Sequence, residues 1–291
     1  MDHVEFQWLY EEGSRKEALQ QLLGCSGQLL KKHFSSVELG RSIQPKDLVR
    51  LPLDLVNHMK INPVYVGPRI SVIKETKDYI AIHKPSLIHC HPLVYSDQDT
   101  VLNFLSQENK QEALKVNINN YDRGLLFRLD FETSGVLVLA KTEEFHAKMR
   151  HDFEKQMKRK LYLVTVEGDF NQEGNWTHYL KGSGAKGAKQ KVSSDPFPES
   201  QSGSLEVKKI ATNNNNKSLL LVSLKTGLRH QIRAQLGFLG FPILGDELYG
   251  GAKAERLFLH AWKYEWDEVI QDDEVDLFDP LLTAALPKEF L

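Results

Sequence analysis

The stretch Phe127-Arg128-Leu129-Asp130-Phe131-Glu132-Thr133-Ser134-Gly135 lies between two apolar runs. The runs at Leu125–Leu129 and from Val136 onward predict two buried strands joined by a short polar turn. Thr, Ser and Gly favour local hydrogen bonds and positive φ, so we expect a sharp bend there. Asp130 would stand at a strand end, where a rigid backbone can present a reactive side chain. The same aspartate could instead cap the turn by bonding to backbone amides, and spacing alone favours that role.

A basic and aromatic segment follows this turn. The pattern predicts a helix from about Thr142 to Gln156, with Thr142 as N-cap and apolar residues recurring every four positions. Its other face continues a basic run up to a predicted strand that starts at Leu161. Tyr162 on that strand could stack on an unpaired base and offer its hydroxyl to chemistry, although the pattern alone favours a core role.

A second helix is predicted beyond the strand Leu219–Leu224, starting after Thr226-Gly227 and ending at Gly240. Arg229 and Arg233 lie four residues apart and are expected to share one face of this helix. An arginine beside a buried carboxylate keeps it ionised and oriented. Arg233 is therefore our candidate partner for Asp130, a role compatible with a purely structural salt bridge.

Two further segments carry weaker signals. Residues 181–204 are rich in Gly, Lys, Ser and Pro and are predicted to form a surface loop, and 213–216 a polar turn. His89 and His91 would alternate onto one face of an extended segment. We do not expect a metal site there, because a zinc site needs three or four convergent ligands and no partner cluster is evident.

Five segments together resemble a known family. They are Arg128-Leu129-Asp130 with Thr133-Ser134-Gly135, Lys160–Val164, His230–Arg233, Gly245–Gly250 and Leu259–Ala261. In order and spacing they are similar to the motifs of pseudouridine synthases of the RluA type, which act on ribosomal and transfer RNA. The resemblance covers residues from about Tyr79 to Trp266. It implies an α+β pseudouridine synthase fold, with a mixed, largely antiparallel central sheet flanked by helices and loops.

The resemblance also implies a reaction, in which uracil is detached from its ribose, turned, and rejoined through carbon 5. Asp130 would act as nucleophile or base at the ribose, Tyr162 would pack on the uracil and assist proton removal at carbon 5, and Arg233 would pair with Asp130. Arg128 would fill the space left by the extruded base. Neither a cofactor nor a metal is implied. The remaining expected site residues are RNA-binding Lys160, Arg229 and His230, and the pocket walls Ile232 and Leu259.

The N-terminal segment predicts a separate small α+β module. Helical periodicity over residues 14–34 predicts two short helices, and Val37–Arg41 and Asp47–Leu51 are expected to form a hairpin. This pattern is similar to a degenerate alpha-L RNA-binding module. We assign residues 1–69 to this module and its linker, and 70–291 to the catalytic domain with an acidic tail. The basic residues of the N-terminal module could contact a phosphate backbone or form an ordinary solvated face.

Composition limits the other possibilities. The 291 residues are 41% hydrophobic and 26% charged, no apolar run reaches the ~18 residues of a membrane span, and residues 1–20 lack a signal-peptide pattern. Cys25 and Cys90 offer no disulfide framework, which suits a reducing cytoplasm. The net charge is −2, but 263–291 contributes −7 and the remainder +5. We expect a cytoplasmic, monomeric protein whose partner is ribosomal or transfer RNA.

Two departures from the family pattern bear on specificity. Phe127 stands where this branch usually has His, and Leu228-Arg229 replace the usual Arg-Thr. The alternative function, from a different class, is a non-catalytic RNA-binding or ribosome-assembly factor on the same fold. A glycoside hydrolase is disfavoured because that chemistry generally needs two carboxylates, and only Asp130 is clearly framed.

Overall fold

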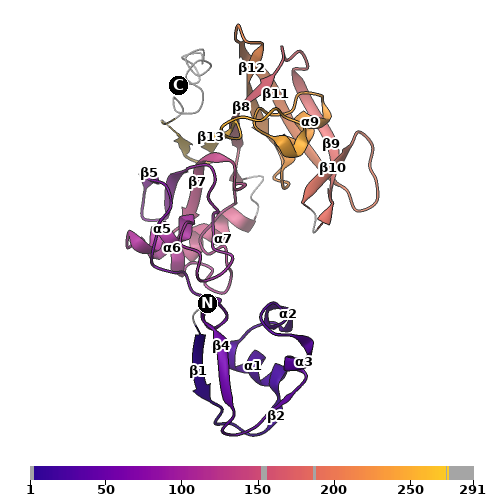
Figure 1. Ribbon diagram of the computed structural model, residues 1–291. Helices are drawn as coiled ribbons and strands as arrows, with labels where there is room; N and C mark the ends of the chain where they lie inside the picture. The colour runs from indigo at the N-terminus through magenta and orange to yellow at the C-terminus, as the bar shows by residue number, and fades with distance from the viewer. Residues whose placement is uncertain (1–2, 152–155, 186–187, 273, 275–291) are drawn as a thin grey trace.

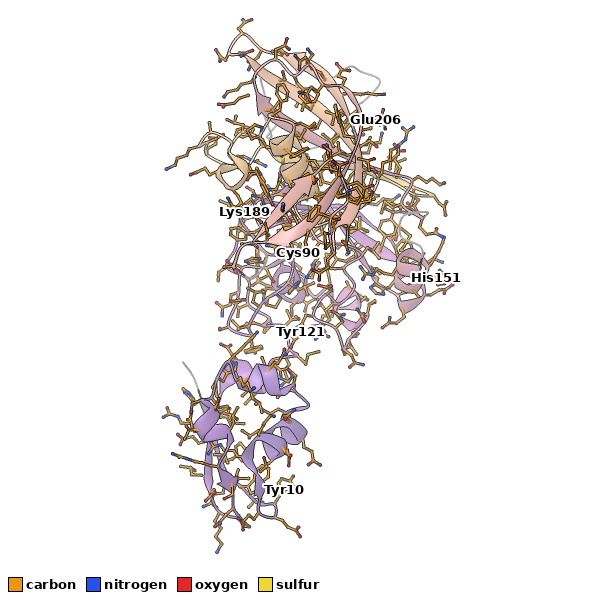
Figure 2. The ribbon with its side chains drawn as sticks, turned by 90° about the vertical axis from the view of Figure 1, so that its right-hand side faces the viewer. Tyr10, Cys90, Tyr121, His151, Lys189 and Glu206 are labelled. Atoms are coloured by element: carbon orange, nitrogen blue, oxygen red, sulfur yellow. The ribbon has the colours of Figure 1, made fainter. Side chains whose placement is uncertain are left out.

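The computed structural model describes residues 3–151, 156–185, 188–272 and 274. It contains two hydrophobic cores (Figure 1). The smaller core is built from residues between Trp8 and Leu55, and the larger one from residues between Ile70 and Ile270. Figure 2 shows the smaller unit at one end, with Tyr10 far from the larger unit and Tyr121 on the side facing it. Among the described residues no helix is long and apolar enough to cross a membrane.

The N-terminal unit mixes short helices with two small sheets. Strand β1 pairs antiparallel with β4, and β2 with β3. Helix α1 ends at Gly24, which takes the left-handed conformation that favours glycine. The elements are β1 (His3–Gln7), β2 (Gly13–Ser14), α1 (Arg15–Leu23), α2 (Gly27–Leu30), α3 (Ser36–Leu39), β3 (Ser42–Ile43), β4 (Leu48–Pro52) and α4 (Leu53–Val56).

The two predicted helices of this unit are present, but the predicted hairpin is wrong. Val37–Arg41 begins in helix α3, because Ser35 and Glu38 form a reciprocal capping box that starts a helix. The predicted strand at Asp47–Leu51 is β4, and its partner is β1 at the start of the chain.

The larger unit is built on a ten-stranded sheet. Its order is β10-β9-β11-β12-β8-β13-β7-β6-β5, with β14 added beside β13. All neighbours are antiparallel except β13 and β7, so the expected mixed, largely antiparallel α+β sheet is confirmed. The strands are β5 (Ser71–Glu75), β6 (Tyr79–Lys84), β7 (Ser134–Ala140), β8 (Arg159–Glu167), β9 (Gly174–Ser183), β10 (Lys189–Ser193), β11 (Gln201–Thr212), β12 (Lys217–Leu224), β13 (Leu259–Glu265) and β14 (Val269–Gln271).

Helices flank the two halves of the sheet (Figure 1). Helices α5 (Val101–Gln107), α6 (Glu112–Lys115) and α7 (Glu143–His151) lie beside the half that contains β5–β7. Helix α9 (Gln231–Phe238) is tied to the other half, because Gln235 donates a hydrogen bond to the carbonyl of Gly203 in β11. A short 3-10 helix, η2 (Glu247–Tyr249), follows α9.

The parallel contact between β7 and β13 joins the two halves. Gly135 lies opposite Ala261 in this pair, with φ of +113°. A side chain at residue 135 would collide with the carbonyl of Ala261. The glycine after Ser134 therefore permits a close approach of two strands, in addition to the bend expected from sequence.

Three element predictions in the larger unit need correction. Leu125, Leu126 and Leu129 are buried, but the segment Leu125–Leu129 makes only one isolated bridge, from Leu125 to Leu139, so it is not a strand. Residues 181–204 are not simply a loop: within the described part they hold the end of β9, the lysine-bearing edge strand β10 and the start of β11. Helix α9 begins at Gln231, after Arg229, so Arg229 and Arg233 do not share a helix face.

The other main predictions agree with the structure. Strands β7, β8 and β12 cover the predicted segments, and 213–216 is a turn. Helix α7 begins where expected, and the amide of Phe145 donates to the Thr142 hydroxyl at 3.2 Å. Met149 of its stripe is buried, whereas Phe153 lies outside the described residues.

Candidate active site

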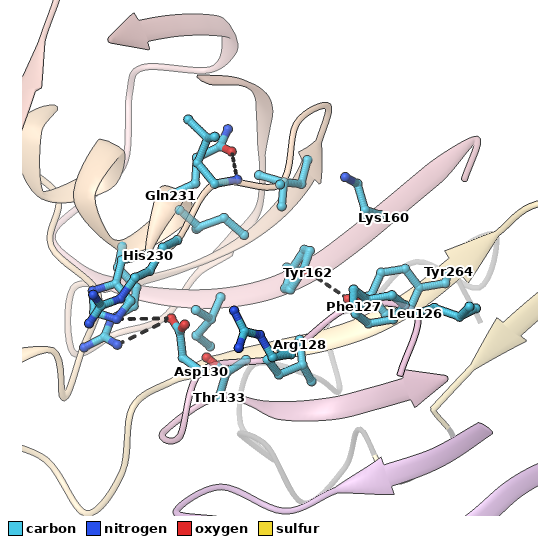
Figure 3. A pocket seen from close by; sticks show the side chains of 18 of the residues that line it. Leu126, Phe127, Arg128, Asp130, Thr133, Lys160, Tyr162, His230, Gln231 and Tyr264 are labelled. Atoms are coloured by element: carbon cyan, nitrogen blue, oxygen red, sulfur yellow. Dashed lines mark hydrogen bonds and ion pairs between the residues drawn. The ribbon is translucent and has the colours of Figure 1, made fainter. Parts of the chain in front are cut away.

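A cavity of about 570 Å³ lies between the segment before β7, strands β8 and β13, and the start of α9 (Figure 3). Its size is within the range of cavities that bind small ligands. Every site residue expected from the sequence lines it. They are Arg128, Asp130, Lys160, Tyr162, Arg229, His230, Ile232, Arg233 and Leu259.

Asp130 enters this cavity from the turn before β7. The hydrogen bond that closes the turn runs from the amide of Thr133 to the backbone carbonyl of Asp130, at 3.2 Å. The carboxylate is instead directed at α9, where its Oδ2 lies 3.5 Å from Nη1 of Arg233. The structure therefore brings together the pair predicted from sequence.

Arg233 is held by three carboxylates, of which Asp130 is the most distant. Its Nε and Nη2 donate to Asp246 at 2.8 and 2.9 Å, and its Nη1 lies 3.2 Å from Glu132. The side chains of Arg233 and Asp246 are 3% and 0% exposed, so this two-point pair is buried. Such charge-assisted pairs are short and fix the orientation of the guanidinium plane.

The surroundings keep Arg233 charged. Burial alone would lower the pKa of its guanidinium, but the hydrogen bonds and charge of Asp246, with Glu132 and Asp130, raise that pKa above its ordinary value. A permanent positive charge therefore stands beside Asp130.

Tyr162 projects from β8 and forms the floor of the cavity with Tyr264 of β13 (Figure 3). The two hydroxyls are 2.7 Å apart. Burial, with a smaller contribution from the charge of Asp130, raises the pKa of Tyr162 to about 12. The phenol is therefore protonated at neutral pH. Phe127 packs on Tyr264 with ring centroids 4.6 Å apart, which places an apolar ring where the family pattern has a histidine.

His230 stands at the first turn of α9 in the left-handed conformation, with φ of +52°. Its Nε2 is 3.9 Å from Asp130, and its Nδ1 is 3.1 Å from the hydroxyl of Tyr249. Burial lowers the pKa of His230, and the nearby Asp130 opposes that shift. The imidazole therefore stands next to the carboxylate without adding a full charge at neutral pH.

Lys84 holds the backbone of the turn that follows Asp130. It is buried, and its ammonium donates to the carbonyls of Phe131 at 3.3 Å and Thr133 at 2.8 Å. Burial lowers the pKa of Lys84 to about 8. The backbone on the C-terminal side of Asp130 is thus fixed by a side chain from the end of β6.

Arg128 occupies the rim of the cavity and is 61% exposed. Its Nη1 lies 3.5 Å from Nε2 of His91 and 3.7 Å from Asp122. His89 instead packs on Phe131. The two histidines thus meet different neighbours, and among the described residues no group of three or more His, Cys, Asp or Glu could hold a metal ion.

The cavity lining is basic, with five Arg or Lys side chains and one carboxylate, Asp130. The basic run expected to lead toward the site is partly neutralised. Lys148 and Lys158 both lie within 3.4 Å of Asp267, and Arg159 lies 3.6 Å from Glu265. The first residues of the acidic segment thus pair with cations of this run that would otherwise be available to a phosphate backbone.

Several site residues escaped prediction. Glu132 and Asp246 both lie within segments that carry the resemblance, so charge complementarity to Arg233 was available as a signal. Tyr264 and Arg150 also line the cavity. Tyr264 carried no signal, because its pattern is that of an ordinary strand residue, whereas Arg150 belongs to the basic run that leads to Tyr162. Lys160, expected to contact RNA, is 4% exposed, and its ammonium donates to the carbonyl of Thr226 at 3.0 Å.

The chain is similar to known proteins over much of its length. The family model described as RNA pseudouridylate synthase matches residues 78–237. Ribosomal large subunit pseudouridine synthase D of Borreliella burgdorferi is 34% identical over 203 residues, which are 68% of this chain and 61% of that protein. A Bacillus subtilis protein named uncharacterized RNA pseudouridine synthase YhcT is 27% identical over 252 residues, 85% of this chain and 80% of that protein.

Solved structures agree on the fold. Human RNA Pseudouridylate Synthase Domain Containing 1 superposes with a TM-score of 0.58 at 21% identity, covering 75% of this chain and 87% of that one. Human RNA Pseudouridylate Synthase Domain Containing 4 gives a TM-score of 0.53 at 18% identity, with coverage of 76% and 90%.

The sheet, the cavity at its centre and the matched residues define a protein of the pseudouridine synthase class. The chain belongs to the RNA pseudouridylate synthase family, in its RluA-type branch. The predicted family, fold and enzyme class, an isomerase, are thereby confirmed at the level of the family.

Proposed function

We propose that this chain converts specific uridines of ribosomal or transfer RNA to pseudouridine, with Asp130 as the catalytic carboxylate. The observation that carries the proposal is the placement of Asp130: its carboxylate lies in a nucleotide-sized cavity, 3.5 Å from a buried arginine whose own orientation is fixed by Asp246. The basic lining suits a polyanionic substrate. The names of three related proteins refer to the large ribosomal subunit.

In the proposed reaction the bond between ribose C1′ and uracil N1 breaks and a bond between C1′ and C5 forms. C5 loses its proton and N1 gains one, so the atoms balance without a cofactor. Asp130 acts at the ribose as nucleophile or base. Tyr162 packs on the uracil, and because its pKa is about 12 its hydroxyl serves better as a proton carrier, coupled to Tyr264, than as a free phenolate.

The rest of the site would bind and hold the RNA. Ile232 and Leu259, both buried, wall the space for the base. Arg128, Arg229 and His230 are at or near the mouth and would meet the strand. Lys160 would contribute its positive charge to RNA binding from the cavity lining. We further propose that residues 1–69 form an RNA-binding module. A salt dependence of RNA affinity unchanged by Arg15→Ala with Lys31→Ala would count against that role.

The experiment uses RNA labelled with tritium at uridine C5, because isomerisation releases that label. RNA from a strain lacking this gene is incubated with wild type, Asp130→Asn and Tyr162→Phe. We expect release by wild type, none above background by Asp130→Asn, and a reduced rate for Tyr162→Phe, which keeps the ring but loses the hydroxyl.

RNA affinity and unfolding midpoint serve as controls, and both should be close to wild type for Asp130→Asn. Release at the wild-type rate by Asp130→Asn would remove Asp130 from the chemistry. Binding by wild type without release from any RNA would favour the non-catalytic RNA-binding or assembly factor. The proposed cytoplasmic, monomeric state is checked by fractionation and light scattering.

A further inference from the structure

An aromatic ring stands at the surface immediately after the catalytic carboxylate. Phe131 is 37% exposed, and its ring meets the imidazole of His89 with centroids 4.7 Å apart and planes tilted by 39°. Leu87, from the same loop as His89, is 52% exposed. Leu87, His89 and Phe131 are called here the Phe131 platform. Neither the cavity wall nor the hydrophobic core accounts for keeping this apolar surface in water.

The backbone beneath the platform is rigid. The carbonyl of Phe131 accepts hydrogen bonds from the amide of Leu87 at 2.8 Å and from the ammonium of Lys84 at 3.3 Å. Leu87 has φ of +63°, a conformation that is unfavourable for a bulky residue and persists only where its surroundings enforce it. The ring of Phe131 is therefore presented from a fixed point, which lowers the entropic cost of using it for binding.

The platform is continuous with the rim of the cavity. His91, two residues after His89, lies 3.5 Å from Arg128, which lines the cavity. Arg128 precedes Asp130 and Phe131 follows it, and both contact the loop 85–92. An RNA strand whose target nucleotide fills the cavity would carry a neighbouring nucleotide past this rim, with a cation for its phosphate and a ring for its base.

We propose that the Phe131 platform stacks the unpaired base next to the target uridine. This inference rests on the proposed function, since it needs a nucleotide in the cavity. Flat aromatic surfaces bind exposed bases of any sequence by stacking, and single-stranded RNA is commonly held in this way. The platform therefore selects for the state of the neighbouring base: a flanking base held in a duplex cannot reach the ring, whereas one in an open loop can.

The test is a double-mutant cycle between protein and RNA. Short single-stranded RNAs carry one central uridine flanked by adenosines, or by an abasic nucleotide on its 5′ or 3′ side. Their dissociation constants are measured with Asp130→Asn protein, with and without Phe131→Ala. We expect loss of the base on one side to weaken binding about tenfold with Phe131 present, and by less than twofold in Phe131→Ala.

Matched variants separate stacking from general damage. Phe238→Ala removes another exposed aromatic that contacts a histidine, His178, but does not line the cavity, and it should leave the abasic penalty unchanged. Phe131→Trp should keep the penalty, and Phe131→Leu should lose most of it although it preserves apolar bulk. Equal abasic penalties on both sides with and without Phe131, in proteins with native unfolding midpoints, would overturn the proposal.

The outcome is independent of catalysis, because Asp130→Asn protein is used throughout. A flank-specific coupling to Phe131 in a protein whose wild type isomerises no RNA would reject the proposed function and keep the platform as an RNA contact. Tritium release without coupling would reject the platform and keep the proposed function.

Discussion

Arg233 and Arg128 stand on opposite sides of Asp130 and are held in opposite ways. Arg233 is buried on α9, with both edges of its guanidinium committed to carboxylates at 2.8 to 3.5 Å. Arg128 is 61% exposed, and its contacts to His91 and Asp122 are 3.5 Å or longer. The side of the cavity that holds Arg233, called here the inner wall, is thus preorganised before RNA arrives. At the rim, Arg128 can exchange its contacts within the protein for contacts with an RNA strand.

The difference assigns separate tasks to the two sides of the cavity. Interactions that are already formed in the free protein can stabilise charge in the transition state without reorganisation. Weak, exposed contacts cost little to break and suit a surface that must accept a polyanion. Substitutions on the two sides should therefore affect different measured quantities.

The largest expected effect comes from Arg233→Ala. Removing the guanidinium leaves the buried Asp246 and the neighbouring Asp130 without their partner, so the single-turnover rate should fall by about a thousandfold. Breaking a buried pair in this way also destabilises a fold by about 3–5 kcal/mol. Affinity for RNA should change by less than tenfold. Rates are measured by tritium release, and stability by urea unfolding.

Two further substitutions check that this effect comes from geometry. Arg233→Lys keeps the charge but loses the two-point pair with Asp246, and should recover stability more than rate. Asp246→Asn leaves Arg233 in place but weakens its anchor, and should reduce the rate by about tenfold to a hundredfold with unchanged RNA affinity. A folded Arg233→Ala protein with an undiminished rate would remove the ion pair from the mechanism.

Arg128→Ala should have an intermediate effect that depends on the substrate. Extruding a uridine from a stem costs a few kcal/mol, and less from a loop where the base is already unpaired. If Arg128 fills the vacated space, its loss should slow the reaction about tenfold more on a stem RNA than on a loop RNA of the same sequence. The comparison uses single-turnover rates. Equal losses on the two RNAs would reject this role for Arg128.

The smallest expected effect concerns His178, which packs against helix α9. His178 is buried against α9, where Gln235 donates to its Nδ1 at 2.9 Å, and burial lowers its pKa below the ordinary 6.5. In the unfolded chain His178 therefore takes up a proton as the pH falls through about 6.5, whereas in the folded chain it stays neutral to lower pH. The free energy of unfolding should therefore decrease as the pH drops below 6.5.

The pH effect is measured by urea unfolding at pH 7.5 and pH 5.5. The stability lost between these two values should be smaller in His178→Phe than in wild type, because the phenylalanine has no group to protonate. Identical losses in the two proteins would show that His178 does not contribute. Phe238→Ala, which changes the same packing but carries no titratable group, provides the control.

Much of the fold and site was predictable because the informative residues are local. The turn at Asp130, the strand of Tyr162 and the helix of Arg233 each have their own sequence pattern, and the family resemblance placed them around one cavity. The expected pairing of Arg233 with Asp130 required only that the two segments meet. The structure agrees, with 3.5 Å between the two side chains.

What escaped prediction depends on contacts distant in sequence. Asp246 accepts the two shortest hydrogen bonds from Arg233, and Asp267 pairs with Lys148 and Lys158. Folding brings these charges together from separate elements. Leu125–Leu129 looks like a strand from its apolar content, yet it forms only a single bridge, at Leu125. Only the helix at Ser36–Leu39 had an overlooked local signal, the capping box of Ser35 and Glu38.

The place of β13 in the sheet has a consequence for how the chain reaches this state. Strand β7 follows Asp130, and strand β8 carries Tyr162. These two strands do not pair with each other, because β13 lies between them and pairs with both. Because β13 follows both β7 and β8 in the sequence, ribosomal synthesis delivers it after them. Long-range and parallel pairings of this kind form slowly. The two halves of the cavity are therefore synthesised before the strand that joins them, and a nascent chain lacks a finished site until β13 has been translated.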